Sequence, residues 1–268
     1  MKPAAQLTSL LTWLILCLAA PAAHASAWDE IRNSVYGAKA IDDGRGIVTL
    51  SAPYRPADMR KVPIGASANF QDGRTVKTIT FIVDENPTPV VALFHLGERR
   101  GSVAITANFR VDRQSEVRAI VETGDGHLYM GSQLVKFAGG QASCSAPLEG
   151  NPAEIATSMG QMQLAQVAVD GAVSPLLGRA KLVLRHPNHT GMVMDQLTLL
   201  YTPMKMVSDI TVRHGEALVL RAEGSIALSQ DPSISFDFMR ANVQELTVSM
   251  TDTDGGSWTH TFPVSPQS

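Results

Sequence analysis

Short runs of apolar and β-branched residues fill most of this 268-residue chain, and turn-forming residues separate them at intervals of roughly ten residues. Runs of this length are typical of strands rather than of helices. In the N-terminal part the expected strands are 46–53, 62–68, 75–84, 90–96, 102–109, 115–122 and 127–137. In the C-terminal part they are 180–185, 197–201, 206–213, 216–222, 234–239, 245–251 and 257–262. The spacing predicts an all-β protein with two antiparallel β-sandwich domains.

A short helix is expected between the two series of strands. Asn151 has a favoured N-cap side chain, and Pro152 follows it at the first helical position. Ile155, Met159 and Met162 then recur at helical spacing, which predicts one apolar face packed on a domain.

The expected domain organisation follows from these elements. Residues 28–137 form the first sandwich, which opens with a short helix over 28–35. Residues 138–178 form a linker that contains the other short helix. Residues 179–268 form the second sandwich.

The N-terminus has the pattern of a secretory signal peptide. One lysine precedes the apolar run 7–20, and small residues then provide cleavage sites ending at Ala25 or Ala27. The run is too short to span a membrane comfortably. We therefore expect residues 1–27 to be removed and the mature protein to be periplasmic.

Charge and hydropathy exclude some partner classes. The chain has 22 basic and 25 acidic residues, and removal of Lys2 with the signal peptide leaves 21 against 25, a net charge of −4. Weak acidity argues against a nucleic-acid partner. No later apolar run approaches membrane-spanning length, so no membrane span is expected in the mature chain.

Cysteine usage singles out one thiol. Cys17 lies in the signal peptide, so Cys144 is the only cysteine expected in the mature protein and cannot form an intramolecular disulfide. Gly139 and Gly140 precede it and would give the segment flexibility. The thiol is either a reactive group presented to a partner or a small apolar side chain buried under a loop. No lysine, arginine or histidine lies within seven residues of Cys144, so the local sequence does not activate it.

Histidine and methionine side chains cluster after the second domain begins. They are His186, His189, Met192, Met194, Met204 and Met206. Thioether and imidazole ligands suit Cu(I) in an exported protein. The same alternation is expected of core positions in strands, which is the favoured interpretation, and no metal site or other cofactor is predicted.

The sequence contains weak indications of an enzyme at most. Ser143 or Ser145 with His127 could be imagined as a nucleophile and its base, but the surrounding residues do not match a nucleophile elbow. Phosphate-binding loops and zinc-protease motifs are absent from the sequence. The chain is therefore interpreted as a non-enzyme.

Two groups of motifs resemble a known pair of proteins. In the first half, Ile79–Val90, Phe94 and a Gly-Gly pair followed by Cys144 resemble the sulfur-carrier subunit SoxY. In the second half, the motifs that resemble its partner SoxZ are Leu184–Gly191 with Asp195, Asp231–Phe236 and Thr251–Gly255. The order in one polypeptide is similar to that of fused SoxYZ-like carriers associated with quinoprotein (pyrroloquinoline quinone, PQQ) dehydrogenases.

The resemblance implies a fold, a site and partners. Both domains would be immunoglobulin-like β-sandwiches, and Cys144 would be the covalent carrier of a sulfur-containing or other intermediate. Gly139 and Gly140 would correspond to the flexible arm, and His186 and His189 are candidates for a partner surface. The implied partners are periplasmic oxidoreductases, including a PQQ-dependent dehydrogenase and cytochrome c.

The sequence departs from the family pattern around the cysteine. Gln141, Ala142 and Ser143 separate Gly140 from Cys144, and the chain continues into the second domain, which tethers the arm at both ends. The cargo is therefore left open. The alternative function is a non-redox adaptor for a periplasmic dehydrogenase or cytochrome, in which the cysteine is incidental.

Overall fold

The computed structural model describes residues 26–137, 139, 142–167, 176–240 and 243–264. Nearly all of the expected signal peptide, as well as Gly140, lies outside these residues. The helices are α1 (Ala27–Tyr36) and α2 (Pro152–Ser158), and a 3-10 turn covers Ser143–Ser145. The strands before α2 are β1 (Ile41–Asp43), β2 (Val48–Ser51), β3 (Val62–Asn69), β4 (Val76–Val83), β5 (Val90–Leu96), β6 (Ser102–Phe109), β7 (Ser115–Thr123) and β8 (Leu128–Val135). Those after α2 are β9 (Met162–Val167), β10 (Leu177–Leu184), β11 (Val207–His214), β12 (Ala217–Gly224), β13 (Ser233–Met239), β14 (Glu245–Asp252) and β15 (Ser257–Pro263).

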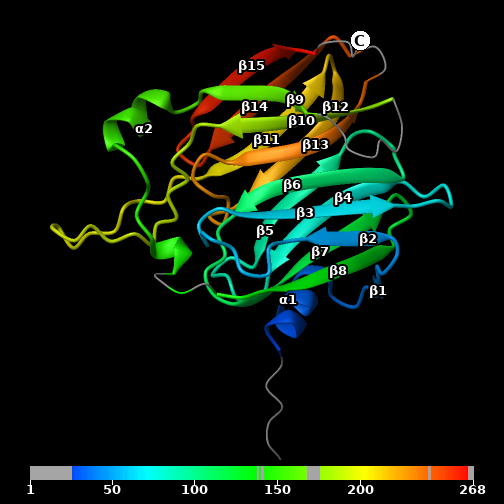
Figure 1. Ribbon diagram of the computed structural model, residues 1–268, viewed down its shortest axis with the longest axis horizontal. Helices are drawn as coiled ribbons and strands as arrows, with labels where there is room; N and C mark the ends of the chain where they lie inside the picture. Colours follow the sequence, from blue (N-terminus) through cyan, green and yellow to red (C-terminus); the bar gives the residue numbers. More distant parts are fainter. Residues whose placement is uncertain (1–25, 138, 140–141, 168–175, 241–242, 265–268) are drawn as a thin grey trace, which may run out of the picture.

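The strands form two sheets (Figure 1). The prediction that the protein is mostly β, with a β-sandwich fold, is confirmed. The larger sheet has the order β1-β8-β7-β4-β5-β12-β11-β14-β15. The smaller has the order β2-β3-β6-β13-β10-β9. We call α1 to β8 the first half and β9 to β15 the second half.

Each sheet continues from one half into the other. In the larger sheet β5 pairs antiparallel with β12, with Phe94 opposite Ala222. In the smaller sheet β6 pairs with β13, with Ile105 opposite Phe236. The halves are thus joined by two rows of backbone hydrogen bonds as well as by the covalent connection, which the sequence patterns do not reveal.

One hydrophobic core fills the space between the sheets and extends through both halves. Phe81 meets Phe94 edge to face at 5.6 Å between ring centroids and Phe109 at 5.5 Å. Phe236 of β13 belongs to the same buried cluster. Alternate inward residues of the strands supply this core, as expected for half-buried strands.

Helix α1 packs on the outer side of the larger sheet. Its Ile31 contacts Ile82, Ile120 and Leu128 in a second apolar cluster, separate from the main core. The Ser26 hydroxyl accepts a hydrogen bond from the Asp29 N–H and caps the helix.

Helix α2 begins as the sequence predicts but ends earlier. The Asn151 side chain accepts a hydrogen bond from the Ala153 N–H, and Pro152 is the first helical residue. The prediction that Met162 shares its apolar face is wrong, because Met162 is a buried residue of strand β9. Gly160, with φ +86°, turns the chain between the two elements. Part of the expected linker therefore belongs to the smaller sheet, where β9 pairs with β10.

The prediction of a strand at 197–201 is also wrong. Residues 191–205 instead form a projecting hairpin-like loop, seen in yellow at the left of Figure 1. Isolated bridges join Met194 to Tyr201 and His189 to Lys205 at its base. The side chain of Leu197 at the tip is 94% exposed. We call residues 191–205 the apolar hairpin.

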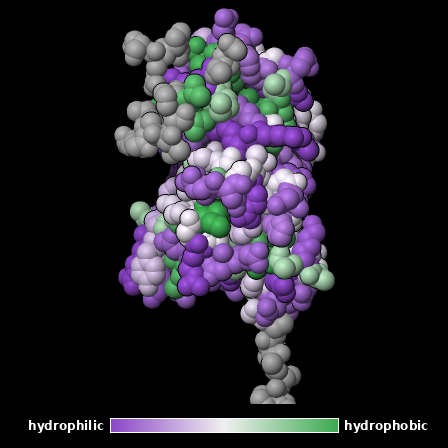
Figure 2. Space-filling model, turned by 90° about the vertical axis from the view of Figure 1, so that its right-hand side faces the viewer, coloured by the Kyte–Doolittle hydropathy of each residue, from purple (hydrophilic) through white to green (hydrophobic). Residues whose placement is uncertain are grey.

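The opposite end of the molecule has a different surface. Figure 2 faces that end and shows mainly hydrophilic side chains with small scattered hydrophobic patches. Within the described ranges, no helix is long and apolar enough to cross a membrane.

Candidate functional site

Cys144 lies inside the protein rather than on its surface. It occupies the 3-10 turn Ser143–Ser145, and its exposed fraction is 0%. Gly139, one of the two glycines expected to give flexibility, is exposed and has φ +95°, a backbone conformation that favours glycine. The expectation of a thiol freely presented on a mobile segment does not match this arrangement.

Both halves of the molecule hold the cysteine backbone. The Cys144 N–H donates a hydrogen bond of 2.9 Å to Asp112 Oδ1, from the segment after β6. The Cys144 carbonyl accepts a hydrogen bond of 2.6 Å from Thr190 Oγ1, from the segment after β10. The two partners are themselves buried. The turn is therefore fixed at the boundary between the halves by polar contacts, and Cys144 belongs to neither apolar cluster.

The surroundings keep the thiol protonated. Burial raises the pKa of Cys144 to about 12, and the Asp112 carboxylate acts in the same direction. The Arg110 guanidinium opposes them by lowering the thiol pKa. In this closed arrangement the sulfur is a poor nucleophile at neutral pH, because the thiolate is the reactive form.

Arg110 is, with Asp112, one of two charged residues beside Cys144 that sequence reasoning missed. It follows strand β6, and its Nη1 donates hydrogen bonds to the Ile226 carbonyl at 2.9 Å and to the Leu228 carbonyl. Burial lowers the pKa of Arg110 to about 10, so the side chain stays charged at neutral pH. Sequence separation from Cys144 concealed this neighbour, and only the strand topology brings the two residues together.

The two histidines suggested for a partner surface differ in position. His186 is 1% exposed, so the expectation that it reaches the surface is wrong. Its Nδ1 accepts a hydrogen bond from the Asn188 N–H, which leaves Nε2 to donate to Asp252 Oδ2 at 3.3 Å. His189 is half-buried and lines a pocket, so it can still be reached from solvent.

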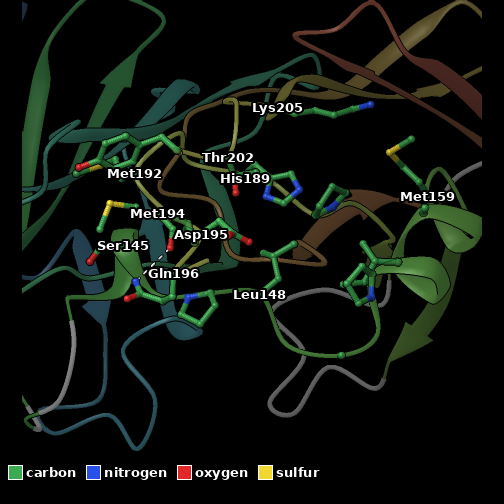
Figure 3. A pocket seen from close by; sticks show the side chains of 18 residues that line it. Ser145, Leu148, Met159, His189, Met192, Met194, Asp195, Gln196, Thr202 and Lys205 are labelled. Atoms are coloured by element: carbon green, nitrogen blue, oxygen red, sulfur yellow. Dashed lines mark hydrogen bonds between the residues drawn. The ribbon is translucent and has the colours of Figure 1, made fainter. Parts of the chain in front are cut away.

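A pocket of about 950 Å³ lies next to the cysteine turn (Figure 3). Ser145 and Leu148 line one side, Met159 lies beyond the end of α2, and His189 and Met194 come from the second half. Its surface is more apolar than polar. The pocket opens between the segment that follows Cys144 and the apolar hairpin.

The pocket contains some of the methionine and histidine side chains that were considered as Cu(I) ligands. Met192 and Met194 line it with His189, whereas Met206 does not. In the part of the chain that the structure describes, no group of three or more His, Cys, Asp and Glu side chains is placed to hold a metal ion.

The structure does not assemble the imagined serine nucleophile and base. The Thr123 N–H at the end of β7 donates to the His127 carbonyl, whereas Cys144, next to Ser143, bonds to Asp112 before the start of β7, so the length of β7 lies between the two side chains. The Ser143 hydroxyl is buried, which also keeps it from a substrate.

Comparisons with known proteins decide the family. The model for sulfur oxidation protein SoxY matches residues 32–141, and the model for sulphur oxidation protein SoxZ matches residues 169–263. The chain belongs to the SoxY and SoxZ families, fused in that order. The resemblance found in the sequence motifs is thus confirmed, and Cys144 lies three residues beyond the end of the SoxY match.

Solved structures give weaker similarities. The sulfur carrier protein SoxY from Chlorobium limicola f thiosulfatophilum is 21% identical, covers 41% of this chain and 91% of its own, and has a TM-score of 0.36. A superoxide reductase (neelaredoxin) E23A from Ignicoccus hospitalis is 13% identical, covers 34% of this chain and 79% of its own, and has a TM-score of 0.28. Among curated proteins, none matches the chain.

The family assignment fixes the broad function. SoxY and SoxZ domains indicate a sulfur-oxidation carrier protein, and such proteins are carriers or adaptors rather than enzymes. SoxYZ proteins partner with other redox and sulfur-oxidation proteins and are typically periplasmic.

Proposed function

We propose that this fused protein is a periplasmic carrier that holds a sulfur-containing intermediate covalently on Cys144 and presents it to partner oxidoreductases. One observation carries the proposal. The only cysteine outside the N-terminal apolar segment lies just beyond the SoxY match, in a polar niche to which both halves contribute. A thiol that merely filled space would be expected in the apolar core instead.

The buried thiol is the resting state of this carrier. Exposing it requires the turn Ser143–Ser145 to separate from Asp112 and Thr190, which are its hydrogen-bond partners on the two halves. Burial is the largest cause of the raised pKa of Cys144. Opening therefore moves the thiol pKa back toward its ordinary value and makes the sulfur reactive at the moment when a partner can reach it.

The pocket beside the turn is where a partner would engage. It borders Ser145, and His189 and the apolar hairpin form its far wall. A partner that displaced this part of the chain would release the cysteine turn directly. By analogy with the fused carriers that this sequence resembles, the partners are a PQQ-dependent dehydrogenase and cytochrome c.

A second function, that of a non-redox adaptor, is favoured by a different observation. Cys144 is fully buried, while Leu197, Leu199 and Leu200 of the apolar hairpin are 94%, 67% and 68% exposed. Isolated exposed apolar residues are ordinary, but a cluster of them on a projecting loop is typical of a protein contact. In that case the hairpin binds the dehydrogenase or cytochrome and the cysteine is incidental.

Measurement of the intact mass of the wild-type protein distinguishes the carrier function from the adaptor function. The protein is purified from the periplasm without reductant and weighed before and after reduction, with Cys144→Ala as the matched control. A carrier shows a reducible adduct that the variant lacks, and the folded variant loses all activity in the partner pathway. A bare thiol, together with full pathway activity of Cys144→Ala, contradicts the carrier function and supports the adaptor.

A further inference from the structure

The methionines of the apolar hairpin are exposed to solvent. Met192, Met194 and Met204 are 37%, 38% and 47% exposed, whereas every other methionine among the described residues is buried or half-buried. Methionine is ordinarily a core side chain, so the interpretation of these three as core positions of a strand is wrong. Their sulfur atoms are instead within reach of a ligand from solvent.

Two of these methionines line the pocket of about 950 Å³ beside the cysteine turn. Met192 and Met194 are two residues apart on one arm of the hairpin, and in Figure 3 they lie toward one side of the pocket. Met159 lies toward the opposite side in the same view. Met204 does not line the pocket. The pocket therefore brings two thioether groups of the hairpin together on one wall.

His189 adds an imidazole to the same pocket. Its carbonyl accepts a hydrogen bond of 3.1 Å from the Lys205 N–H, which holds its backbone at the base of the hairpin. Within the part of the chain that the structure describes, its ring makes no hydrogen bond. The ring of His186, by contrast, uses both of its nitrogens. The half-buried His189 ring can therefore coordinate a metal ion without losing a hydrogen bond to the protein.

The charged side chains of the pocket are already engaged. Lys205 lines it, but the Lys205 ammonium lies 3.6 Å from carboxylate oxygens of both Asp252 and Asp254, which compensate its charge. Asp195 is the carboxylate among the described lining residues, and its Oδ1 accepts two backbone N–H groups at the tip of the hairpin. The wall formed by the methionines and His189 is therefore governed by neutral side chains.

The available ligand atoms determine which metal would suit the pocket. Ca²⁺ and Mg²⁺ require oxygen ligands, and in the described ranges no three or more His, Cys, Asp and Glu side chains are placed to hold a metal ion. Thioether sulfur lies outside that set of ligands. It is a soft ligand that selects Cu(I), and imidazole also suits copper.

We propose that Met192, Met194 and His189 form a binding site for Cu(I) on the wall of the pocket. Two sulfur atoms and one imidazole nitrogen supply three ligands. A methionine side chain has three rotatable bonds, and isolated bridges join the arms of the hairpin, so the sulfur atoms can adjust around one ion. The inference does not rest on the carrier function, because the fully buried Cys144 supplies no ligand.

Competition with a chromophoric Cu(I) chelator tests the site. The purified full-length protein is titrated with Cu(I) in the absence of oxygen and in the presence of ferrozine, whose Cu(I) complex is measured by absorbance. Wild type should withhold one Cu(I) per chain from the chelator. Cys144→Ala should withhold the same amount, which excludes the thiol as a ligand.

Substitution of the ligands should weaken binding of Cu(I). The double variant Met192→Leu with Met194→Leu, and separately His189→Gln, should each lower the affinity at least about tenfold, since even outer-shell partners of a metal change its affinity by 10- to 100-fold. Leucine conserves the volume of methionine, so the variants fold. Met204→Leu on the same hairpin and His260→Gln at an exposed site on β15 are matched controls that should keep the wild-type affinity.

Three results would overturn the inference. Complete transfer of Cu(I) from wild type to the chelator removes the site. Binding that disappears in Cys144→Ala but persists in the double methionine variant assigns the copper to the thiol. A loss in Met204→Leu equal to that in the double variant shows that the copper binds exposed thioethers without selecting the pocket.

Discussion

At the scale of single residues, Cys144 takes its chemistry from contacts that are remote in sequence. The 3-10 turn alone would leave a small thiol with an ordinary pKa. Hydrogen bonds to Asp112 and Thr190 fix the turn. Burial raises the pKa of the thiol, and among the described residues Arg110 is the cation that acts to lower it. The reactivity of the Cys144 thiol therefore depends on whether the turn is closed or open.

Loss of the Thr190 contact should make the turn open more often. Thr190→Val removes the hydrogen bond to the Cys144 carbonyl, a contribution of about 1 kcal/mol to the closed form. The rate of Cys144 alkylation by iodoacetamide should rise about fivefold, since an opening equilibrium shifts by that factor. The rate is followed by mass spectrometry under native conditions.

The control for this variant is Thr198→Val. Thr198 lies on the apolar hairpin, and its hydroxyl bonds to Asp195 rather than to the cysteine turn. Alkylation should keep the wild-type rate there. Equal rates for all three proteins would mean that Thr190 does not hold the turn closed.

His186 makes stability depend on pH. Burial lowers its pKa below the ordinary 6.5, although Asp252 opposes the effect, and Lys205 and His189 add to the lowering. Between pH 7.5 and 5.5 the unfolded imidazole therefore takes up more protons than the buried ring does. The unfolded state then binds more protons, so the free energy of unfolding falls as the pH falls.

Urea denaturation at pH 7.5 and 5.5 measures this change. Wild type should be less stable at pH 5.5 than at pH 7.5 because of His186, with a further loss in the same direction from His189, whose pKa burial also lowers. His186→Gln should show a smaller loss, whereas His260→Gln, at an exposed site, should keep the wild-type loss. Equal or greater stability of wild type at pH 5.5 would contradict the assignment.

At the scale of elements, most strands could be predicted because their patterns depend on local alternation and turn residues. The second half shows where local patterns fail. Leu197–Tyr201 has the composition of a strand, yet Asp195 Oδ1 accepts hydrogen bonds from the Leu197 and Thr198 N–H groups and bends the chain into a turn. The apolar side chains then face solvent instead of a core.

Only part of the candidate site around Cys144 could be predicted from the sequence. The sequence indicated Cys144 as a candidate site residue, because a lone thiol after a Gly-Gly pair can be seen there, and its role as carrier stays a prediction. Its burial could not be predicted, since the turn contains small residues that suit either a surface or an interior. Arg110 could not be assigned to the site either, because its approach depends on where β6 ends relative to the second half.

The backbones of β5 and β12 come close together at Gly97, and a substitution there tests this contact. A Cβ placed on Gly97 would overlap the Leu218 backbone carbonyl. Gly97→Ala should therefore lower the free energy of unfolding by about 3 kcal/mol, the upper part of the range for overpacking. Urea denaturation measures the loss.

Gly131→Ala on β8 is the comparison for Gly97→Ala. The nearest atom to its Cβ would be Val48 Cγ1 at 3.3 Å, the end of a side chain that can shift slightly. Its stability should change by less than about 1 kcal/mol in either direction. Similar values for the two variants would show that the backbones at Gly97 are not in close contact.

At the scale of the whole molecule, the two halves form one packed body. Both sheets and the main core cross from one half to the other, so the two halves share one main apolar interior, and only the small cluster under α1 lies within the first half alone. The cysteine turn lies at the same boundary and contacts both sides. Any movement between the halves would be transmitted to the turn through Asp112 and Thr190.

The paired strands across the boundary also limit which subunits can assemble. In a cell that makes separate SoxY and SoxZ polypeptides, either one could in principle exchange with a half of this protein. Here β5 and β6 already have β12 and β13 as partners from the same chain, held at high effective concentration by the covalent connection. A free subunit would have to displace both strands at once. The fused carrier is thereby insulated from cross-assembly, and its one-to-one stoichiometry does not depend on expression levels.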